Sequence, residues 1–244
     1  MRLLLLSNST NHGGGYLDHA MPAIRELLGR ARRLVFVPFA LHDRAGYTAK
    51  ARERFAREGV EVVGVTADAA GVAAMEEAEA VFVGGGNTFR LLDHLQRSGL
   101  LPPLRRRALA GMPYLGASAG TNVAAPTIKT TNDMPIVQPA SFTALGLVPF
   151  QVNPHYLDPV PASRHMGETR EERIREFLEE NDVPVVGLRE GTWLSREGDR
   201  LRLEGPAGAR VFRRGREPEE AKPGAALDEL LRGEITLRAS IEQE

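Results

Sequence analysis

The residues best suited to chemistry lie at 116–120, where the sequence reads Gly-Ala-Ser-Ala-Gly. The segment matches the pattern G-x-S-x-G, follows a predicted strand and precedes a short apolar stretch with helical character. In this context the pattern is typical of a nucleophile elbow, a tight strand-to-helix turn that lifts a serine above a sheet. A helix start without chemistry is the alternative, but the strand before it favours Ser118 as a nucleophile.

A nucleophilic serine needs a base to take its proton. Of the six histidines in the chain, only His155 and His165 follow Ser118. His155 comes after an apolar stretch and a proline that restricts the backbone, and we predict it as the base. His165 lies in a polar loop and is interpreted as a surface histidine. Among the earlier histidines, His12 is the best alternative because it follows the first predicted strand.

The base in turn needs an acid that orients its ring. Glu190 follows a predicted buried strand at 183–188, and sites gather at the carboxyl ends of parallel strands. Taken alone, Glu190 is more typical of a turn carboxylate. Asp158 is the rival, although an acid three residues from His155 has an awkward reach. Because only loop lies between Ser118 and His155, the order Ser–His–Glu fits better than Ser–acid–His.

A glycine-rich segment at 84–87, Gly-Gly-Gly-Asn, joins a predicted strand to a predicted helix. Its bare backbone N–H groups can approach a substrate closely and suit a developing oxyanion. A dinucleotide site is excluded, because the third glycine of that motif is missing here and at 13–18, and no Gly-Lys-Ser/Thr phosphate loop occurs. The scattered histidines lack metal-ligand spacing, so we predict neither a metal nor a cofactor.

The elements that must position these residues alternate along the first half of the chain. Strand and helix patterns in alternation indicate parallel βαβ units with helices on both faces of one sheet. We therefore predict an α/β fold, a doubly wound and mostly parallel sheet. The predicted strands are 3–6, 34–37, 60–65, 80–83 and 113–115, and the predicted helices are 17–30, 46–58, 69–78, 88–97 and 104–110.

The second half is predicted less regularly. A loop region at 125–165, rich in Pro, Thr and Asn, is long enough to be functional. Thr169 and Glu172 form a capping-box pattern at the start of a charged helix. One domain over 1–244 is the simplest organisation. The predicted elements are a helix at 169–180, a strand at 183–188, a C-terminal hairpin of 192–196 and 200–203, a surface loop at 215–225 and a last helix at 226–231.

Composition narrows the function classes further. The 244 residues carry a formal net charge of -1 and no cysteine, which excludes a disulfide framework, a Cys-based zinc site and a thiol nucleophile. The opening apolar run stops at Leu6, too short for a secretion signal or a membrane span. Basic clusters at 105–107 and 213–214 are interpreted as solvated faces. We expect a cytoplasmic protein, monomer or homodimer, without nucleic-acid or membrane partners.

Long, ordered motifs resemble the peptidase E family, the alpha-aspartyl dipeptidases. The resemblance runs from the first strand to about residue 213 and implies a sheet similar to class I glutamine amidotransferases (flavodoxin-like), with serine replacing their cysteine. The motifs that carry it are 83–89 (VGGGNTF), 116–120, 130–137 (TTNDMPIV), 153–155 (NPH), 167–171 (GETRE) and 188–191 (LREG).

The resemblance implies a Ser118–His155–Glu190 triad and an oxyanion site made by the N–H groups of Gly85 and Ala119. It also implies a serine peptidase that hydrolyses the bond after an N-terminal aspartate in dipeptides and other small peptides. Small aspartyl peptides are then the expected partners. The alternatives are a cyanophycinase-like or isoaspartyl hydrolase on the same scaffold, or a small-molecule binding protein without turnover.

A pocket selective for aspartate needs a cation, and the planar fork of arginine suits a carboxylate best. The resemblance places Arg170 in that role, although a surface arginine in a charged helix is the alternative. Thr130, Thr131 and Asn132 are expected to add neutral hydrogen bonds. Asn87, next to the glycine segment, completes the predicted substrate-binding set.

Two residues near the nucleophile depart from the family pattern. Ala117 is smaller than the residue expected before the serine, and Thr121 replaces an expected small residue at the helix start. Together they predict a wider pocket mouth.

Overall fold

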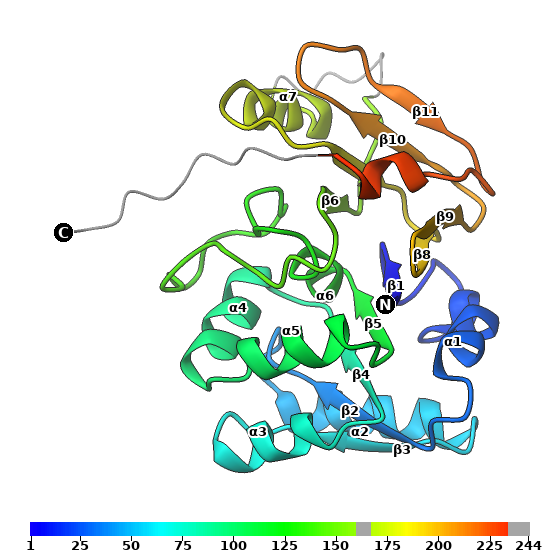
Figure 1. The fold of residues 1–244 in the computed structure, drawn as a ribbon, viewed down its shortest axis with the longest axis vertical. Helices are drawn as coiled ribbons and strands as arrows, with labels where there is room; N and C mark the ends of the chain where they lie inside the picture. The colour runs from blue at the N-terminus through cyan, green and yellow to red at the C-terminus, as the bar shows by residue number, and fades with distance from the viewer. Residues whose placement is uncertain (160–166, 234–244) are drawn as a thin grey trace.

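The computed structural model describes residues 1–159 and 167–233. Its main sheet has seven strands in the order β3-β2-β4-β5-β1-β8-β9 (Figure 1). The first five strands in the chain pair in parallel, and the pair β8 and β9 adds an antiparallel hairpin at one edge. These strands are β1 (Arg2–Leu6), β2 (Arg33–Val37), β3 (Glu61–Gly64), β4 (Ala80–Val83), β5 (Tyr114–Ala117), β8 (Trp193–Glu197) and β9 (Arg200–Glu204).

Helices cover both faces of this sheet, which confirms the predicted α/β class. Alternate residues of β1 divide between two apolar cores: Leu3 and Leu5 pack with α3 to α6, whereas Leu4 and Leu6 pack with α1 and α2. Strands buried on both faces read as continuous apolar runs, which is why the sequence predicts them well. The helices are α1 (Met21–Leu28), α2 (Arg44–Ala56), α3 (Ala69–Glu76), α4 (Thr88–Arg97), α5 (Leu101–Leu109), α6 (Ala119–Asn122) and α7 (Arg170–Glu180), with 3-10 turns η1 (Asp18–Ala20) and η2 (Asp228–Leu231).

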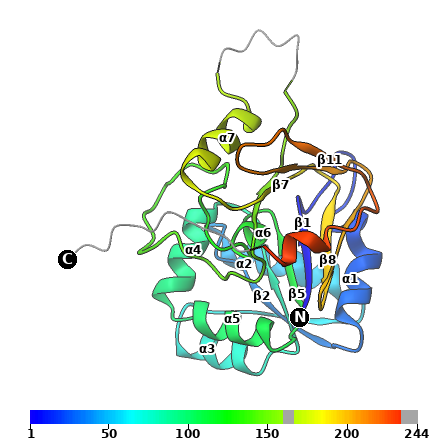
Figure 2. The same cartoon turned by 45° about the horizontal axis from the view of Figure 1, so that its top comes forward.

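A second sheet of four strands, in the order β11-β10-β7-β6, differs from the sequence-based expectation. Figure 1 shows α7 and β11 at the end of the molecule opposite β3, and Figure 2 shows α7, β7 and β11 above the labelled strands of the main sheet. The strand predicted at 183–188 belongs to this sheet and not to the main one. Its strands are β6 (Gln151–Pro154), β7 (Val185–Leu188), β10 (Ala209–Phe212) and β11 (Glu219–Ala221).

Three local predictions are therefore wrong in part. The loop predicted at 125–165 contains β6, the loop at 215–225 contains β11, and the last helix is only the short η2. The core on the α3 to α6 face continues into the second sheet, where it includes Val186, Leu188 and Val211. The two sheets thus share one apolar core.

The predicted start of the charged helix is confirmed. The Thr169 hydroxyl accepts from Glu172 N at 3.2 Å, and the Glu172 carboxylate accepts from Thr169 N at 2.6 Å, a complete capping box. Among the described residues, no helix is long and apolar enough to cross a membrane.

Candidate active site

Ser118 occupies a strained turn between β5 and α6, with φ 52° and ψ -107°. Few non-glycine residues adopt a positive φ, and such strain concentrates at functional sites. Steric crowding explains why glycines flank this turn. A Cβ on Gly116 would lie 2.6 Å from the Gly120 carbonyl oxygen, and one on Gly120 would lie 2.0 Å from that of Val83. The G-x-S-x-G pattern is therefore what this close packing requires.

The structure brings Ser118, His155 and Glu190 together. His155 Nε2 lies 2.9 Å from Ser118 Oγ, and His155 Nδ1 lies 2.6 Å from Glu190 Oε1. His155 follows β6 directly and Glu190 closely follows β7, which pairs with β6 in parallel. Because the carboxyl ends of the two strands lie side by side, a residue after each strand can meet its neighbour. The second sheet thus brings the predicted base and the predicted acid together.

Two residues that follow β1, Ser7 and Asn8, make hydrogen bonds to the segments that carry His155 and Glu190. Ser7 is fully buried, and its Oγ accepts from His155 N at 2.9 Å and donates to Leu188 O at 2.8 Å. His155, like the serine, has a positive φ of 54°. Asn8 Oδ1 accepts from Gly191 N at 2.8 Å, next to the acid. Sequence reasoning missed both positions, and their place just after a central strand is the one signal that could have found them.

The alternatives to Glu190 and His155 were Asp158 as the acid and His12 or His165 as the base. Asp158 binds the Arg189 guanidinium through both oxygens, at 2.7 and 2.8 Å, and hydrogen bonds from Arg189 lower the pKa of the Asp158 carboxyl. His12 is exposed and makes no hydrogen bond to Ser118 or Glu190 in the described part of the chain. His165 lies outside the described residues.

The two predicted oxyanion donors differ in whether their N–H group already has an acceptor among the described residues. Ala119 N–H begins α6 directly after the serine and has no acceptor among the described residues. Gly85 lies against the serine, because a Cβ on it would be 3.1 Å from Ser118 Cβ. Its N–H, however, donates to Tyr47 Oη at 2.8 Å. An oxyanion could accept from Gly85 only by replacing this phenol oxygen.

Four predicted substrate-binding side chains have partners within the protein. Asn87 caps α4 by accepting from Arg90 N, and its amide donates to Met134 O. The threonines and Asn132 tie the turn at 130–133 to α4 and β6: Thr130 Oγ1 donates to Val152 O, Thr131 Oγ1 to Thr88 Oγ1 and Asn132 Nδ2 to Pro154 O. These bonds shape the wall of the site, and direct contact with a substrate stays a prediction.

Arg170 is the first residue of α7 and is half-buried, and among the described residues its guanidinium makes no hydrogen bond or ion pair. Burial lowers its pKa, as does Arg173 nearby, while the Asp133 carboxylate acts in the opposite direction. Asp133 itself accepts from Thr88 N at 2.7 Å, so this carboxylate is held at the start of α4.

The wider pocket mouth predicted from two departures is wrong. Ala117 and Thr121 are both fully buried. The Thr121 hydroxyl donates to Leu6 O at 2.6 Å, with Gly116 O at 3.1 Å, and so fastens α6 to the ends of β1 and β5.

A cavity of about 370 Å³ opens beside the serine on the side of α2. Its walls come from the end of β1, from α2 and from the glycine segment. The lining residues are Asn8, Ser9, Thr10, Tyr16, Leu41, Tyr47, Lys50, Gly85, Gly86, Ser118 and His155.

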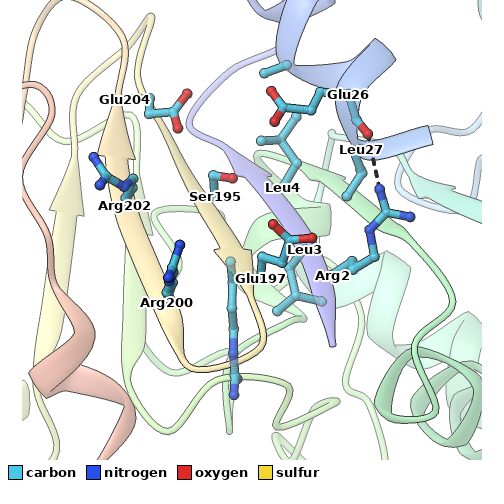
Figure 3. A pocket seen from close by; sticks show the side chains of 12 residues that line it. Arg2, Leu3, Leu4, Glu26, Leu27, Ser195, Glu197, Arg200, Arg202 and Glu204 are labelled. Atoms are coloured by element: carbon cyan, nitrogen blue, oxygen red, sulfur yellow. Dashed lines mark hydrogen bonds between the residues drawn. The ribbon is translucent and has the colours of Figure 1, made fainter. Parts of the chain in front are cut away.

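A second groove, of about 230 Å³, lies between α1 and the β1-β8-β9 edge (Figure 3). Arg2 there donates to Glu26 O at 3.0 Å, and β9 contributes Arg200, Arg202 and Glu204 to the lining. Ser195 in this groove has no hydrogen-bonded base in the parts of the chain described. Nor does any group of three His, Asp or Glu residues suited to a metal occur among the residues described. The Ser118 cavity is therefore the better candidate for chemistry.

Fold and site together place the chain among α/β enzymes with a serine on a nucleophile elbow. The family model of peptidase family S51 matches residues 3–204. Peptidase E of Streptomyces coelicolor is 60% identical over 237 residues, which cover 96% of this chain and 98% of that protein. A Drosophila melanogaster protein, "Probable alpha-aspartyl dipeptidase", is 49% identical over 94% of this chain and 97% of its own length. The chain belongs to peptidase family S51 and is a peptidase.

A solved structure supports the fold separately. The crystal structure of a peptidase from an acI-B1 Actinobacterium superposes with a TM-score of 0.69 at 18% identity, over 93% of this chain and 96% of that one. At such low identity the likeness shows the fold alone, an α/β fold with a flavodoxin-like sheet. The fold and family expected from the sequence are both confirmed.

Proposed function

We propose that this peptidase hydrolyses the bond after an N-terminal aspartate in dipeptides and other small peptides, through Ser118, His155 and Glu190. The observation that carries the proposal is the unbroken contact from serine to imidazole to carboxylate, at 2.9 and 2.6 Å. The aspartyl substrate is supported by the names of the two relatives, which describe a peptidase E and an alpha-aspartyl dipeptidase. Membership of a peptidase family favours turnover over a binding protein.

Each group has a defined task in this mechanism. His155 removes the proton of Ser118 as its Oγ attacks the carbonyl carbon, and Glu190 holds the imidazole and stabilises its cation. The C–N bond then breaks, and the leaving amine takes the proton from His155. In the second half, His155 takes a proton from a water whose oxygen attacks the acyl carbon. The bond between this carbon and Ser118 Oγ then breaks, the imidazolium returns its proton to Oγ, and the aspartate is released.

The negative oxygen of each tetrahedral intermediate needs donors in place. Ala119 N–H at the start of α6 is free to donate, and the helix end adds a positive dipole. Gly85 N–H becomes the second donor when the oxyanion replaces the Tyr47 hydroxyl as its acceptor.

Arg170 is the group we assign to the aspartate side chain. A guanidinium stays charged at any working pH, and its fork can bind both carboxylate oxygens. Its half-buried place beside Asp133, without an ion pair among the described residues, leaves it available for such a partner. Hydrogen bonds hold the side chains proposed to surround this carboxylate, which are those of Asn87, Thr130, Thr131 and Asn132.

The remaining predictions concern the whole chain. We infer a single peptidase domain over 1–244, supported by the apolar core that spans both sheets. A cytoplasmic location and a monomeric or dimeric state stay predictions.

Hydrolysis of three dipeptides by the wild-type chain tests the substrate. Asp-Leu should be cleaved about 100-fold faster than Ala-Leu or isoaspartyl-Leu, because Ala-Leu lacks the carboxylate and the isoaspartyl bond displaces it. Cleavage of isoaspartyl-Leu alone would favour the isoaspartyl alternative on the same scaffold, and equal cleavage of Ala-Leu would remove the role of Arg170.

A further inference from the structure

The cavity beside the serine and the predicted aspartate site lie on opposite faces of the main sheet. Tyr16 and Tyr47, which line the cavity, belong to the apolar core shared with α1 and α2. The 130–133 turn and Arg170 instead adjoin α4, whose apolar residues belong to the other core. Ser118 follows β5, a central strand, and stands between the two.

Because the two sites lie on opposite sides of Ser118, the acyl part and the leaving part of a substrate would bind on opposite sides of the serine. A peptide attacked at Ser118 has its acyl part on one side of the serine and its leaving amine on the other. If the aspartate carboxylate reaches Arg170 on the α4 side, the residue beyond the broken bond enters the cavity on the α2 side.

The cavity suits an amino acid with a free carboxylate. Tyr16 and Tyr47 meet edge-on with ring centroids 6.4 Å apart, and Leu41 adds an exposed apolar wall. Burial raises the pKa of both phenols, so they stay neutral. Lys50 carries the permanent positive charge of the lining, with its Nζ 4.4 Å from the centre of the Tyr16 ring.

Lys50 also lacks an ion-pair partner among the described residues. It is exposed on α2, and no carboxylate of the described residues forms an ion pair with it. By contrast Arg57, about two helical turns after Lys50, pairs with Glu53 at 2.8 Å. A cation that is left without an anion at the edge of a catalytic cavity is a place where a substrate anion gains a charge-assisted bond.

We propose that this cavity binds the residue released from the substrate, with Lys50 holding its C-terminal carboxylate and Tyr16, Tyr47 and Leu41 contacting its side chain. The proposal rests on the function proposed above. In a dipeptide only one Cα separates the scissile nitrogen from the terminal carboxylate, so the charge lies close to the serine. A longer peptide carries its carboxylate further out, and the site thereby favours dipeptides.

The test compares Asp-Leu with its C-terminal amide on the wild type and on Lys50→Gln. A charge-assisted bond predicts that wild type prefers the free acid in kcat/KM by about 10–100-fold. Lys50→Gln should lose the same factor in kcat/KM on Asp-Leu, mainly through a higher KM, because the substitution removes a contact made equally in the ground state and the transition state. For the amide, kcat/KM of the variant should stay within about 2-fold of the wild-type value. The amide rate also shows that the variant is folded.

Arg57→Gln is the matched control, because it removes an exposed cation from the end of the same helix and should retain the preference for the free acid. Equal wild-type rates on acid and amide would overturn the proposal, as would an equal loss on both substrates in Lys50→Gln. If wild type cleaved isoaspartyl-Leu instead, the aspartyl function would fail. The same acid-to-amide comparison on that peptide would then still decide the role of Lys50.

Discussion

Ser7 at the end of β1 accepts a hydrogen bond from the backbone N–H of His155 at 2.9 Å, across 148 residues of chain. The bond holds a residue whose φ of 54° is otherwise unfavourable. Because Ser7 also donates to Leu188 O, one buried hydroxyl joins the main sheet to both strands that carry the base and the acid. The position of the imidazole thus depends on a hydroxyl that is fully buried.

The first prediction concerns this bond. Ser7→Ala leaves the His155 N–H without this partner and lets the imidazole move relative to Ser118. We expect kcat on Asp-Leu to fall by about 10–100-fold with KM nearly unchanged, because a displaced base transfers the proton less efficiently in the transition state.

Steady-state kinetics of the variant, beside Ser195→Ala as a control, measure this effect. Ser195 is a partly exposed serine on the neighbouring β8, and its loss should change neither constant. A Ser7→Ala variant with a lower Tm and an unaltered kcat would show a structural role only.

Arg170 gives the second prediction. Arg170→Gln removes the cation assigned to the aspartate side chain, so kcat/KM for Asp-Leu should fall by about 100-fold, the value of a strong charge-assisted bond. The rate on Ala-Leu should stay as it is, and the selectivity between the two peptides should collapse.

The control for this change is Arg173→Gln on the same helix, where the arginine is exposed and pairs with Glu168 at 3.3 Å. Its selectivity should match wild type. If Arg173→Gln and Arg170→Gln behaved alike, the general charge of α7 and not a specific contact would attract the substrate.

The third prediction concerns pH and stability. Burial, and then the Arg44 guanidinium at 2.7 Å from Nε2, lower the pKa of His94 below its ordinary 6.5. The unfolded chain therefore binds a proton more readily than the folded one, and folding stability decreases as the pH falls below about 6.5.

His94→Gln removes this titrating group, so thermal unfolding between pH 7.5 and 5 should show a smaller decline in Tm, by roughly 1–3 °C. The comparison is between the slopes of Tm against pH, because the substitution also alters stability at all pH values. A steeper slope in the variant would contradict the sign of the shift.

The sequence predicted the elements that local patterns determine. The apolar runs of β1 to β5 and the capping box of Thr169 are such patterns, and the structure confirms them. The apolar run of β7 was predicted as a strand, but its sheet was not, and β6 and β11 were missed because they lack a pattern of their own. β11 reads Glu-Glu-Ala and β6 reads Gln-Val-Asn-Pro, and only pairing with distant strands makes them sheet.

The site shows the same division. The turn around Ser118 requires small residues, so its motif is visible in the sequence. The meeting of His155 with Glu190 depends on the pairing of β6 with β7, and the resemblance to a family supplied what the local residues left open. Ser7 and Tyr47 make their contacts with segments far away in the sequence, and the place of Ser7 just after β1 is the one local signal.

The most direct test of the central claim is kcat of Ser118→Ala on Asp-Leu. A serine nucleophile within a triad predicts a loss of about 10⁴–10⁶-fold, since removing one member disables the unit. The folded state of the variant can be checked by its Tm. Turnover close to wild type in a folded Ser118→Ala chain would contradict the account, because the reaction would then proceed without the residue on which the whole site converges.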